Sequence, residues 1–233
     1  APEYVESVWW SLKEIWKKGL LVQDHRVAPY CPRCGTGLSD HELSQGYETV
    51  VDPSVFVRFP VTSGELADLG ASLLVWTTTP WTIPANQAMN VHPELTYALV
   101  DVGDKLLILA KDRVETCLQD YGLEGKVIAT CQGAQLAHIS FWHPLAPLYD
   151  GYKRLSPIYP AEYVTLDTGT GVVHSAPAYG EEDFKSCKAN QLDDKDILNP
   201  VMGNGVYASW LPLFANEYIW KANPKIVEAM REA

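Results

Sequence analysis

Short β-rich runs dominate the middle of this chain and constrain its fold more than any other feature of the sequence. From residue 47 onward the apolar side chains no longer recur at helical spacing but gather in segments of strand length. The two runs on either side of Gly103 and Asp104 predict a hairpin. The expected strands are residues 50–61, 71–78, 96–102, 104–110, 126–131, 163–166 and 171–174.

Helical spacing is confined to other, shorter parts of the chain. Gly19 is expected to stop the first helix, and three acidic residues open the third, where they suit the positive end of a helix dipole. A long Pro-rich stretch covers residues 143–160. The expected helices are residues 3–21, 112–121, 181–189 and 216–233, the last with an interruption at Pro224. The chain therefore predicts an α+β fold that is mostly β and barrel-like, not a regular βαβ alternation.

The composition excludes several classes of protein. The chain has 233 residues, of which 47% are hydrophobic, so it can bury a sizeable core. Its 18 Lys and Arg against 29 Asp and Glu give a net charge of −11, which disfavours a stand-alone nucleic-acid binder. No apolar run approaches the ~20 residues of a membrane span, and the N-terminus carries no secretory signal. Five cysteines, an odd number, do not suggest a disulfide framework, so a cytoplasmic location is expected.

Cys31 and Cys34 form one CxxC knuckle, which can supply two of the four ligands of a structural zinc ion. The second CxxC of a zinc ribbon is missing from the sequence. Three interpretations stay open: half of a ribbon whose other half lies outside this chain, a complete site that uses His25 or His41, or no metal at all. A redox role is not expected, because no βαβ unit surrounds the motif.

Two polar segments follow predicted strands, where they could hold a small ligand. Residues 76–82 read WTTTPWT, and three successive threonines at a strand end cannot all point inward. Pro80 removes a backbone donor and ends the strand pairing. Taken alone, this segment also fits an ordinary strand that runs into a turn, since Thr favours strands.

The second segment, residues 169–184, reads GTGVVHSAPAYGEEDF. It puts His174 at the end of a predicted strand and Asp183 in the first turn of a predicted helix. A lone His is more often structural than catalytic, and a first-turn Asp is more often a cap or a dipole partner. The glycines precede a strand, so the segment is no dinucleotide-binding fingerprint, and the sequence has no GxSxG, Walker or HExxH motif.

Together, WTTTPWTIPAN (residues 76–86) and GTGVVHSAPAYGEEDF resemble the editing domain, or connective peptide 1, of isoleucyl-tRNA synthetase, a class I aminoacyl-tRNA synthetase. The related valyl and leucyl enzymes carry Arg where this chain has Thr79, and His174 also matches the isoleucine type. The resemblance implies three parts: residues 1–46 as the junction with the catalytic core, with half of a zinc ribbon, 47–221 as the editing domain, and 222–233 as a helical junction. It also implies the barrel-like domain of the valyl, leucyl and isoleucyl enzymes, with peripheral helices.

The resemblance implies hydrolysis of mischarged Val-tRNA(Ile) and Val-AMP. Ile differs from Val by one methylene, worth only ~1–3 kcal/mol of discrimination, and isoleucyl-tRNA synthetase is itself the standard example of this limit. By resemblance, Asp183 binds the substrate's α-ammonium group and His174 helps to exclude Ile. By resemblance, water is the nucleophile, and the lack of a convincing Ser-His-Asp or Cys-His arrangement in the sequence fits a site that positions water and substrate.

The other site residues implied by the resemblance line the pocket for the amino acid and the terminal adenosine. They are Thr77, Thr78, Thr79, Trp81 and Asn86. Thr78 joins Asp183 and His174 as a candidate catalytic residue. Editing is expected to need no cofactor: zinc is considered only at the incomplete Cys31 and Cys34 site, and ATP and Mg²⁺ belong to the catalytic core of the parent enzyme.

The expected partners are the 3′ end of tRNA(Ile) carrying valine and the rest of isoleucyl-tRNA synthetase, and no membrane. No HIGH-like or KMSKS-like signature occurs, so this chain is not expected to activate amino acids. An alternative is a module that binds the tRNA 3′ end, or serves structure, without hydrolysis of its own. A free-standing deacylase is a third hypothesis, disfavoured by the half zinc site and by a first residue other than Met.

Overall fold

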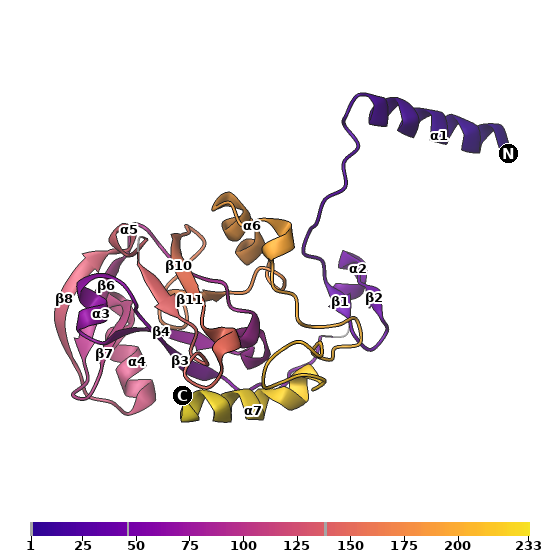
Figure 1. The fold of residues 1–233 in the computed structure, drawn as a ribbon. Coiled ribbons are helices and arrows are strands. Elements are labelled where there is room, and N and C mark those ends of the chain that lie inside the picture. Colours follow the sequence, from indigo (N-terminus) through magenta and orange to yellow (C-terminus); the bar gives the residue numbers. More distant parts are fainter. Residues whose placement is uncertain (1, 46, 138) are drawn as a thin grey trace.

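The computed structural model describes residues 2–45, 47–137 and 139–233 (Figure 1). The helices are α1 (Pro2–Lys17), α2 (Asp40–Leu43), α3 (Gly64–Asp68), η1 (Pro80–Ala85), η2 (Lys111–Arg113), α4 (Val114–Tyr121), α5 (Gly133–Leu136), η3 (Asp150–Tyr152), α6 (Glu181–Ala189), η4 (Asp194–Asp196) and α7 (Ile219–Glu232), where η marks a 3₁₀ helix. The strands are β1 (Tyr30–Cys31), β2 (Thr36–Gly37), β3 (Val55–Pro60), β4 (Ala71–Thr77), β5 (Ala88–Val91), β6 (Thr96–Asp101), β7 (Leu106–Ala110), β8 (Lys126–Gln132), β9 (Ser140–Trp142), β10 (Leu155–Pro160) and β11 (Val172–Ser175).

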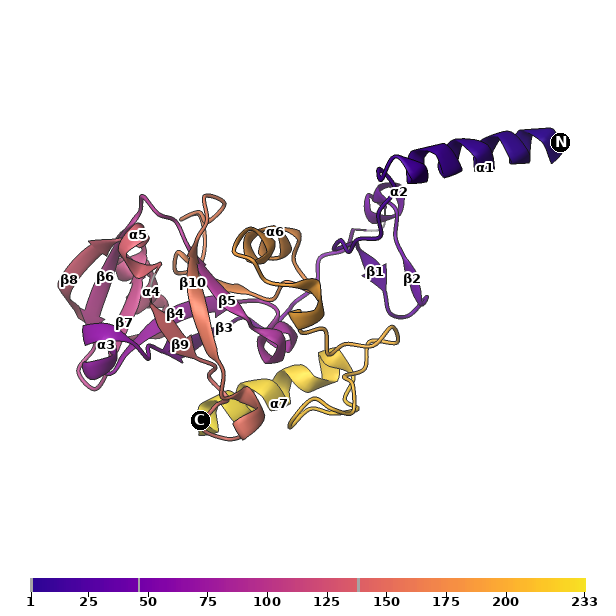
Figure 2. The same cartoon turned by 45° about the horizontal axis from the view of Figure 1, so that its top comes forward.

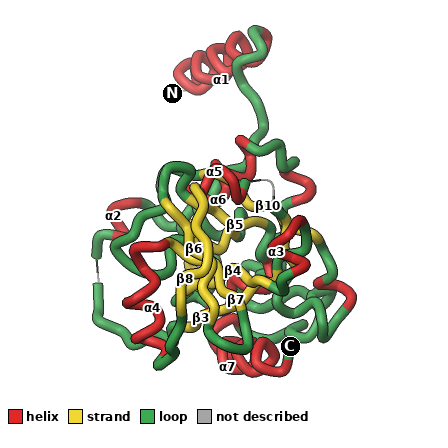
Figure 3. Tube along the Cα trace, turned by 90° about the vertical axis from the view of Figure 1, so that its left-hand side faces the viewer, coloured by secondary structure: helices red, strands yellow, loops and turns green. Residues whose placement is uncertain are grey.

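Two sheets form the body of the molecule. The larger has the strand order β3-β4-β7-β6-β8, and the smaller has the order β11-β5-β10-β9. A single bridge between Val61 and Phe141 joins the end of β3 to β9, so the two sheets adjoin there. Helices lie around the strands (Figure 3). The predicted mixed fold with peripheral helices is confirmed, and over the described residues the sheets remain open and do not close into a barrel.

The main core lies between the two sheets. It contains side chains that are wholly buried, among them Phe59, Met89 and Phe141. A second, smaller cluster lies on the other face of the larger sheet, under α4. Successive residues of β4 point into different clusters, Leu73 into the first and Leu74 into the second. Burial on both faces explains the apolar run from Leu73 to Trp76 in this strand, and each such large side chain contributes about 1.5–3 kcal/mol.

Most of the predicted elements occur with shifted ends, and three differ. Residues 163–166 do not form a strand; they lie in the turn region between β10 and β11, where Val164 is buried at 2% exposure. The apolar pattern there reflects a buried turn. The Pro-rich stretch contains β10, which pairs with β9 through Pro157 and then with β5 through Pro160. Each of these prolines stands at the last pair with one partner, where strand pairing ends.

The third difference is at the C-terminus, where α7 begins at Ile219 and continues through Pro224. Pro224 is exposed, and the helix continues through it without the expected interruption. Ala222 and Ile226 are wholly buried in the main core, and α7 passes residue 221 without a break. The domain boundaries at 46 and 221 stay predictions.

Helix α1 projects away from the body of the molecule (Figures 1 and 2). None of its residues is buried, and Trp9, Trp10 and Trp16 are each about two-thirds exposed. The helix ends at Lys17, ahead of Gly19 in the left-handed conformation. Among the described helices, none is long and apolar enough to cross a membrane.

Candidate functional site

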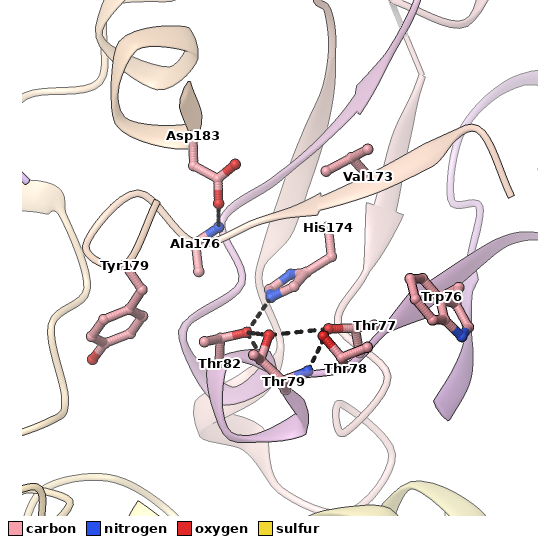
Figure 4. A pocket seen from close by; sticks show the side chains of 10 residues that line it. All are labelled: Trp76, Thr77, Thr78, Thr79, Thr82, Val173, His174, Ala176, Tyr179 and Asp183. Atoms are coloured by element: carbon pink, nitrogen blue, oxygen red, sulfur yellow. Dashed lines mark hydrogen bonds between the residues drawn. The ribbon is translucent and has the colours of Figure 1, made fainter. Parts of the chain in front are cut away.

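A pocket of about 240 Å³ opens where β4 ends and β11 passes beside it (Figure 4). The two segments singled out in the sequence supply its walls, one from β4 and η1 and the other from β11 and α6. Five predicted site residues line it: Thr77, Thr78, Thr79, His174 and Asp183. The other lining residues are Trp76, Thr82, Val173, Ala176 and Tyr179.

The threonine segment turns sharply because β4 ends at Thr77 and Pro80 begins η1. The Thr77 hydroxyl accepts a hydrogen bond from the Thr79 amide at 3.1 Å, which fixes the turn. Thr77 itself is 8% exposed, whereas Thr78 and Thr79 are exposed. The Thr78 hydroxyl makes no hydrogen bond to another described residue, so it is available to a ligand in the pocket.

Both ring nitrogens of His174 are held by protein groups. Thr82 donates its hydroxyl proton to the Thr79 carbonyl at 2.9 Å, so its oxygen, 2.8 Å from Nε2 of His174, acts as the acceptor. Nδ1 of His174 accepts from the Asn86 side-chain amide at 2.8 Å. These bonds assign the neutral tautomer with its proton on Nε2. Burial lowers the pKa of His174 to about 4, which agrees with a neutral ring.

Asn86 and Trp81 lie behind the pocket and do not line it. Asn86 is wholly buried; its amide also donates to the Ala88 carbonyl at 3.0 Å, and because that carbonyl can only accept, the orientation of the amide is fixed. Trp81 packs edge-on against Tyr179, with ring centroids 5.0 Å apart. Both residues therefore contact groups that line the pocket: Asn86 holds His174 and Trp81 holds Tyr179.

Asp183 comes from the first turn of α6, and its carboxylate turns back toward β11. Oδ2 accepts from the Ala176 amide at 3.0 Å, and Oδ1 accepts from the Tyr163 hydroxyl at 3.3 Å. Its side chain caps no amide of its own helix. Over the described ranges Asp183 forms no salt bridge, so no cation neutralises it. Burial raises the pKa of Asp183 above its usual range, against the Ala176 and Tyr163 hydrogen bonds, which lower it.

Gly180 leaves room for this carboxylate. A Cβ atom at position 180 would lie 2.8 Å from Oδ2 and 2.9 Å from Cγ of Asp183. Gly180 has an ordinary extended conformation, with φ of −135°, so the requirement for glycine here is steric and not conformational. Gly180, which precedes α6, therefore helps to determine where the Asp183 carboxylate lies.

Sequence reasoning missed several residues of the site. Trp76, Thr82 and Tyr179 lie within the two quoted segments, and their place beside the predicted residues was the available signal. Tyr163 lies outside both segments, in a stretch expected to be a strand. No local pattern indicated that its hydroxyl would reach Asp183.

Cys31 and Cys34 lie on the β1–β2 hairpin, away from the pocket. The Cys34 amide donates to Cys31 Sγ at 3.3 Å, and this bond lowers the pKa of the Cys31 thiol. Within the described residues no third ligand joins the two thiols. The two candidate histidines contact other residues: Nδ1 of His25 lies 3.4 Å from Oδ2 of Asp194, and Nε2 of His41 is hydrogen-bonded to the side-chain amide of Gln45. The two sulfur donors fit half of a zinc shell, and zinc binding stays a prediction.

Comparison with known proteins identifies the family. The model for class I tRNA synthetases (I, L, M and V) matches residues 1–222. The chain belongs to this family. It is 52% identical over 235 residues to isoleucine–tRNA ligase of Ralstonia pickettii, and 50% identical over 233 residues to isoleucine–tRNA ligase 1 of Burkholderia mallei. Each match covers 96% of this chain but 24% of the ligase, so the chain spans about a quarter of the length of these synthetases.

Solved structures of leucyl-tRNA synthetases share the fold. The crystal structure of GlLeuRS-CP1 superposes with a TM-score of 0.60 at 15% identity, covering 77% of this chain and 96% of that one. The editing domain of the P. knowlesi cytosolic leucyl-tRNA synthetase gives 0.55 at 12% identity, covering 81% and 96%. The resemblance of this chain to the editing domain of isoleucyl-tRNA synthetase, inferred from the two segments, is therefore confirmed. The roles of individual site residues stay predictions.

Proposed function

We propose that this chain is the part of an isoleucyl-tRNA synthetase that hydrolyses valine from mischarged tRNA(Ile), and also clears Val-AMP. The observation that carries the proposal is the carboxylate of Asp183, which lines a pocket, is held by two neutral donors and forms no salt bridge among the described residues. A partly buried anion of this kind is the partner that the free α-ammonium group of an aminoacyl ester needs.

The ester is expected to lie along the threonine segment. The hydroxyls of Thr78 and Thr79 are exposed to the pocket and can bond to the ester or to the terminal ribose. With the ammonium group at Asp183, the ester carbonyl is held in one orientation for attack. Positioning of this kind supplies a large part of the rate enhancement without a covalent intermediate.

Water is the nucleophile in this proposal. The closest hydroxyl–imidazole pair in the pocket is Thr82 with His174, at 2.8 Å. In this pair the imidazole nitrogen carries the proton, and the Thr82 proton is directed at the Thr79 carbonyl. His174 therefore cannot take a proton from Thr82, and its other nitrogen is engaged by Asn86. Nucleophilic catalysis by Thr82 does not fit this arrangement.

His174 forms a stiff side of the pocket in this proposal. Its ring is fixed by hydrogen bonds at both nitrogens, so it does not swing aside for a larger side chain. The extra methylene of Ile is worth only ~1–3 kcal/mol, which makes a small, rigid pocket a better discriminator than a flexible one.

The charge of the chain agrees with a restricted contact to tRNA. At a net charge of −11, this domain is not expected to hold the tRNA body. It needs to accept only the flexible 3′ end with its aminoacyl group, while the rest of the synthetase holds the tRNA. ATP and Mg²⁺ are used by that remaining part.

The test is deacylation by the purified chain of Val-tRNA(Ile) and Ile-tRNA(Ile), followed at equal enzyme concentration. The proposal predicts faster loss of valine than of isoleucine. Equal rates, or no rate above the buffer control at high enzyme concentration, would instead favour a module that binds the tRNA 3′ end without hydrolysis.

A further inference from the structure

We propose that Tyr163 is a positioning residue, whose hydroxyl holds the Asp183 carboxylate in the orientation that meets the substrate's ammonium group. This inference rests on the proposed editing function and deepens it. Neither segment that carries the resemblance includes Tyr163.

The carboxylate of Asp183 is confined on three sides. The Ala176 amide donates to one oxygen at 3.0 Å, and the Tyr163 hydroxyl donates to the other at 3.3 Å. The third side is Gly180, whose missing side chain leaves the space that the carboxylate occupies. Without the Tyr163 hydroxyl, a single amide hydrogen bond would hold the group, and the carboxylate could rotate about its χ2 torsion, which is soft.

Tyr163 reaches Asp183 from a separate part of the fold. It lies in the turn region between β10 and β11, next to Val164, which is 2% exposed. Tyr163 therefore approaches Asp183 from a segment outside α6. The hydroxyl thus ties the start of α6 to the sheet that carries His174.

The same hydrogen bond favours the ionised form of Asp183. Burial and the neighbouring Glu182 raise the pKa of Asp183, whereas the Ala176 amide and the Tyr163 hydroxyl lower it. Two other groups packed near it carry no positive charge: His174 on β11 is neutral, and the pKa of the Cys187 thiol on α6 is raised to about 11. Among the residues that the structure describes, no salt bridge to Asp183 would compensate for a lost hydroxyl, so its removal should raise the pKa of Asp183 further.

Tyr163→Phe removes the hydroxyl and little else. Tyr152→Phe is the matched control, because its hydroxyl also donates one hydrogen bond, to the Pro212 carbonyl at 3.0 Å, and does not contact Asp183. Two measurements are made on wild type and both variants. One is the carboxyl ¹³C titration of Asp183 by NMR, and the other is kcat/KM for Val-tRNA(Ile) deacylation between pH 5.5 and 8.

In Tyr163→Phe we expect the Asp183 titration to move to higher pH, with the acid limb of kcat/KM moving the same way. The loss should be about tenfold and larger at the acid end of this range than at its alkaline end, because hydrogen bonds to charged groups are the stronger kind. Tyr152→Phe should leave both profiles unmoved. An unchanged Asp183 titration in Tyr163→Phe overturns the proposal, whatever the activity. A shifted titration together with an inactive wild type leaves the Tyr163–Asp183 hydrogen bond in place but overturns the editing function, and with it the role of Tyr163 in positioning Asp183 for the substrate.

Discussion

Replacing Asp183 by Asn isolates the charge of the carboxylate from its shape. The two side chains have the same heavy-atom framework, so the amide oxygen can still accept from the Ala176 amide. The amide nitrogen then faces Tyr163, whose hydroxyl can reverse and accept. The variant therefore keeps the local hydrogen bonds and loses only the negative charge.

The expected loss of activity follows from unpairing the substrate's ammonium group in a partly dry pocket. Removing one partner of such a pair costs about 2–5 kcal/mol. At ~1.36 kcal/mol for each factor of ten, kcat/KM for Val-tRNA(Ile) should fall roughly 30- to 5,000-fold.

Stability should respond in the opposite direction. Because burial raises the pKa of Asp183, its ionised form is less favourable in the folded protein than in the unfolded chain. This contribution to stability is present at low pH and is lost as the pH rises through the folded-state pKa. At pH 7 the neutral Asn should therefore leave the melting temperature unchanged or raise it.

Single-turnover deacylation and a melting curve test these expectations together. Glu182→Gln is the matched control, because it removes one negative charge, as Asp183→Asn does, from the residue just before Asp183. Glu182 is exposed, and its Oε1 pairs with Nζ of Lys185 at 3.1 Å. It should retain activity within about twofold, since exposed pairs contribute little. The reasoning would be refuted if Asp183→Asn kept wild-type turnover, or if it lost activity only in proportion to a fall in melting temperature.

Three further predictions concern His174, Gly180 and the cysteine pair. His174→Ala should begin to deacylate Ile-tRNA(Ile) while retaining part of the Val-tRNA(Ile) rate, because the discrimination at stake is only ~1–3 kcal/mol; an unchanged Val-to-Ile ratio speaks against its place in the pocket. Gly180→Ala should displace the Asp183 carboxylate and lower kcat/KM about tenfold or more, with a stability loss of about 1–3 kcal/mol measured by denaturant unfolding; wild-type turnover would show that the space is not needed. After a chelator wash, metal analysis should find well under one zinc per chain, because Cys31 and Cys34 supply two of four ligands; a full, tightly held equivalent contradicts this.

The sequence could predict which segments form the site because each follows a strong local signal. Thr77 ends a strand whose preceding residues, 73–76, are all apolar, and Pro80 forces the turn that exposes the next hydroxyls. Asp183 stands in an acidic first turn of a helix whose bounds agree with the prediction, residues 181–189. Signals of this kind depend only on residues close together in the sequence, so they can be recognised before the fold is known.

Contacts between distant segments could not be predicted in this way. The hydroxyl of Tyr163 meets Asp183 only because β10 and β11 bring their connecting turn beside α6. The local pattern around Tyr163 suggested a strand, since buried Val164 in a turn gives the same apolar signal. Likewise, Pro224 predicts an interrupted helix, whereas α7 continues through it with Ala222 and Ile226 packed in the main core.

The central claim is that the carboxylate of Asp183 recognises the free ammonium group of the aminoacyl ester. It is tested most directly by comparing Val-tRNA(Ile) with N-acetyl-Val-tRNA(Ile), which lacks that charge, on wild type and on Asp183→Asn. The account predicts that wild type cleaves the acetylated ester roughly 30- to 5,000-fold more slowly, and that Asp183→Asn cleaves both esters at similar low rates. Equal cleavage of the two esters by the wild-type chain, or an undiminished preference in Asp183→Asn, would contradict it.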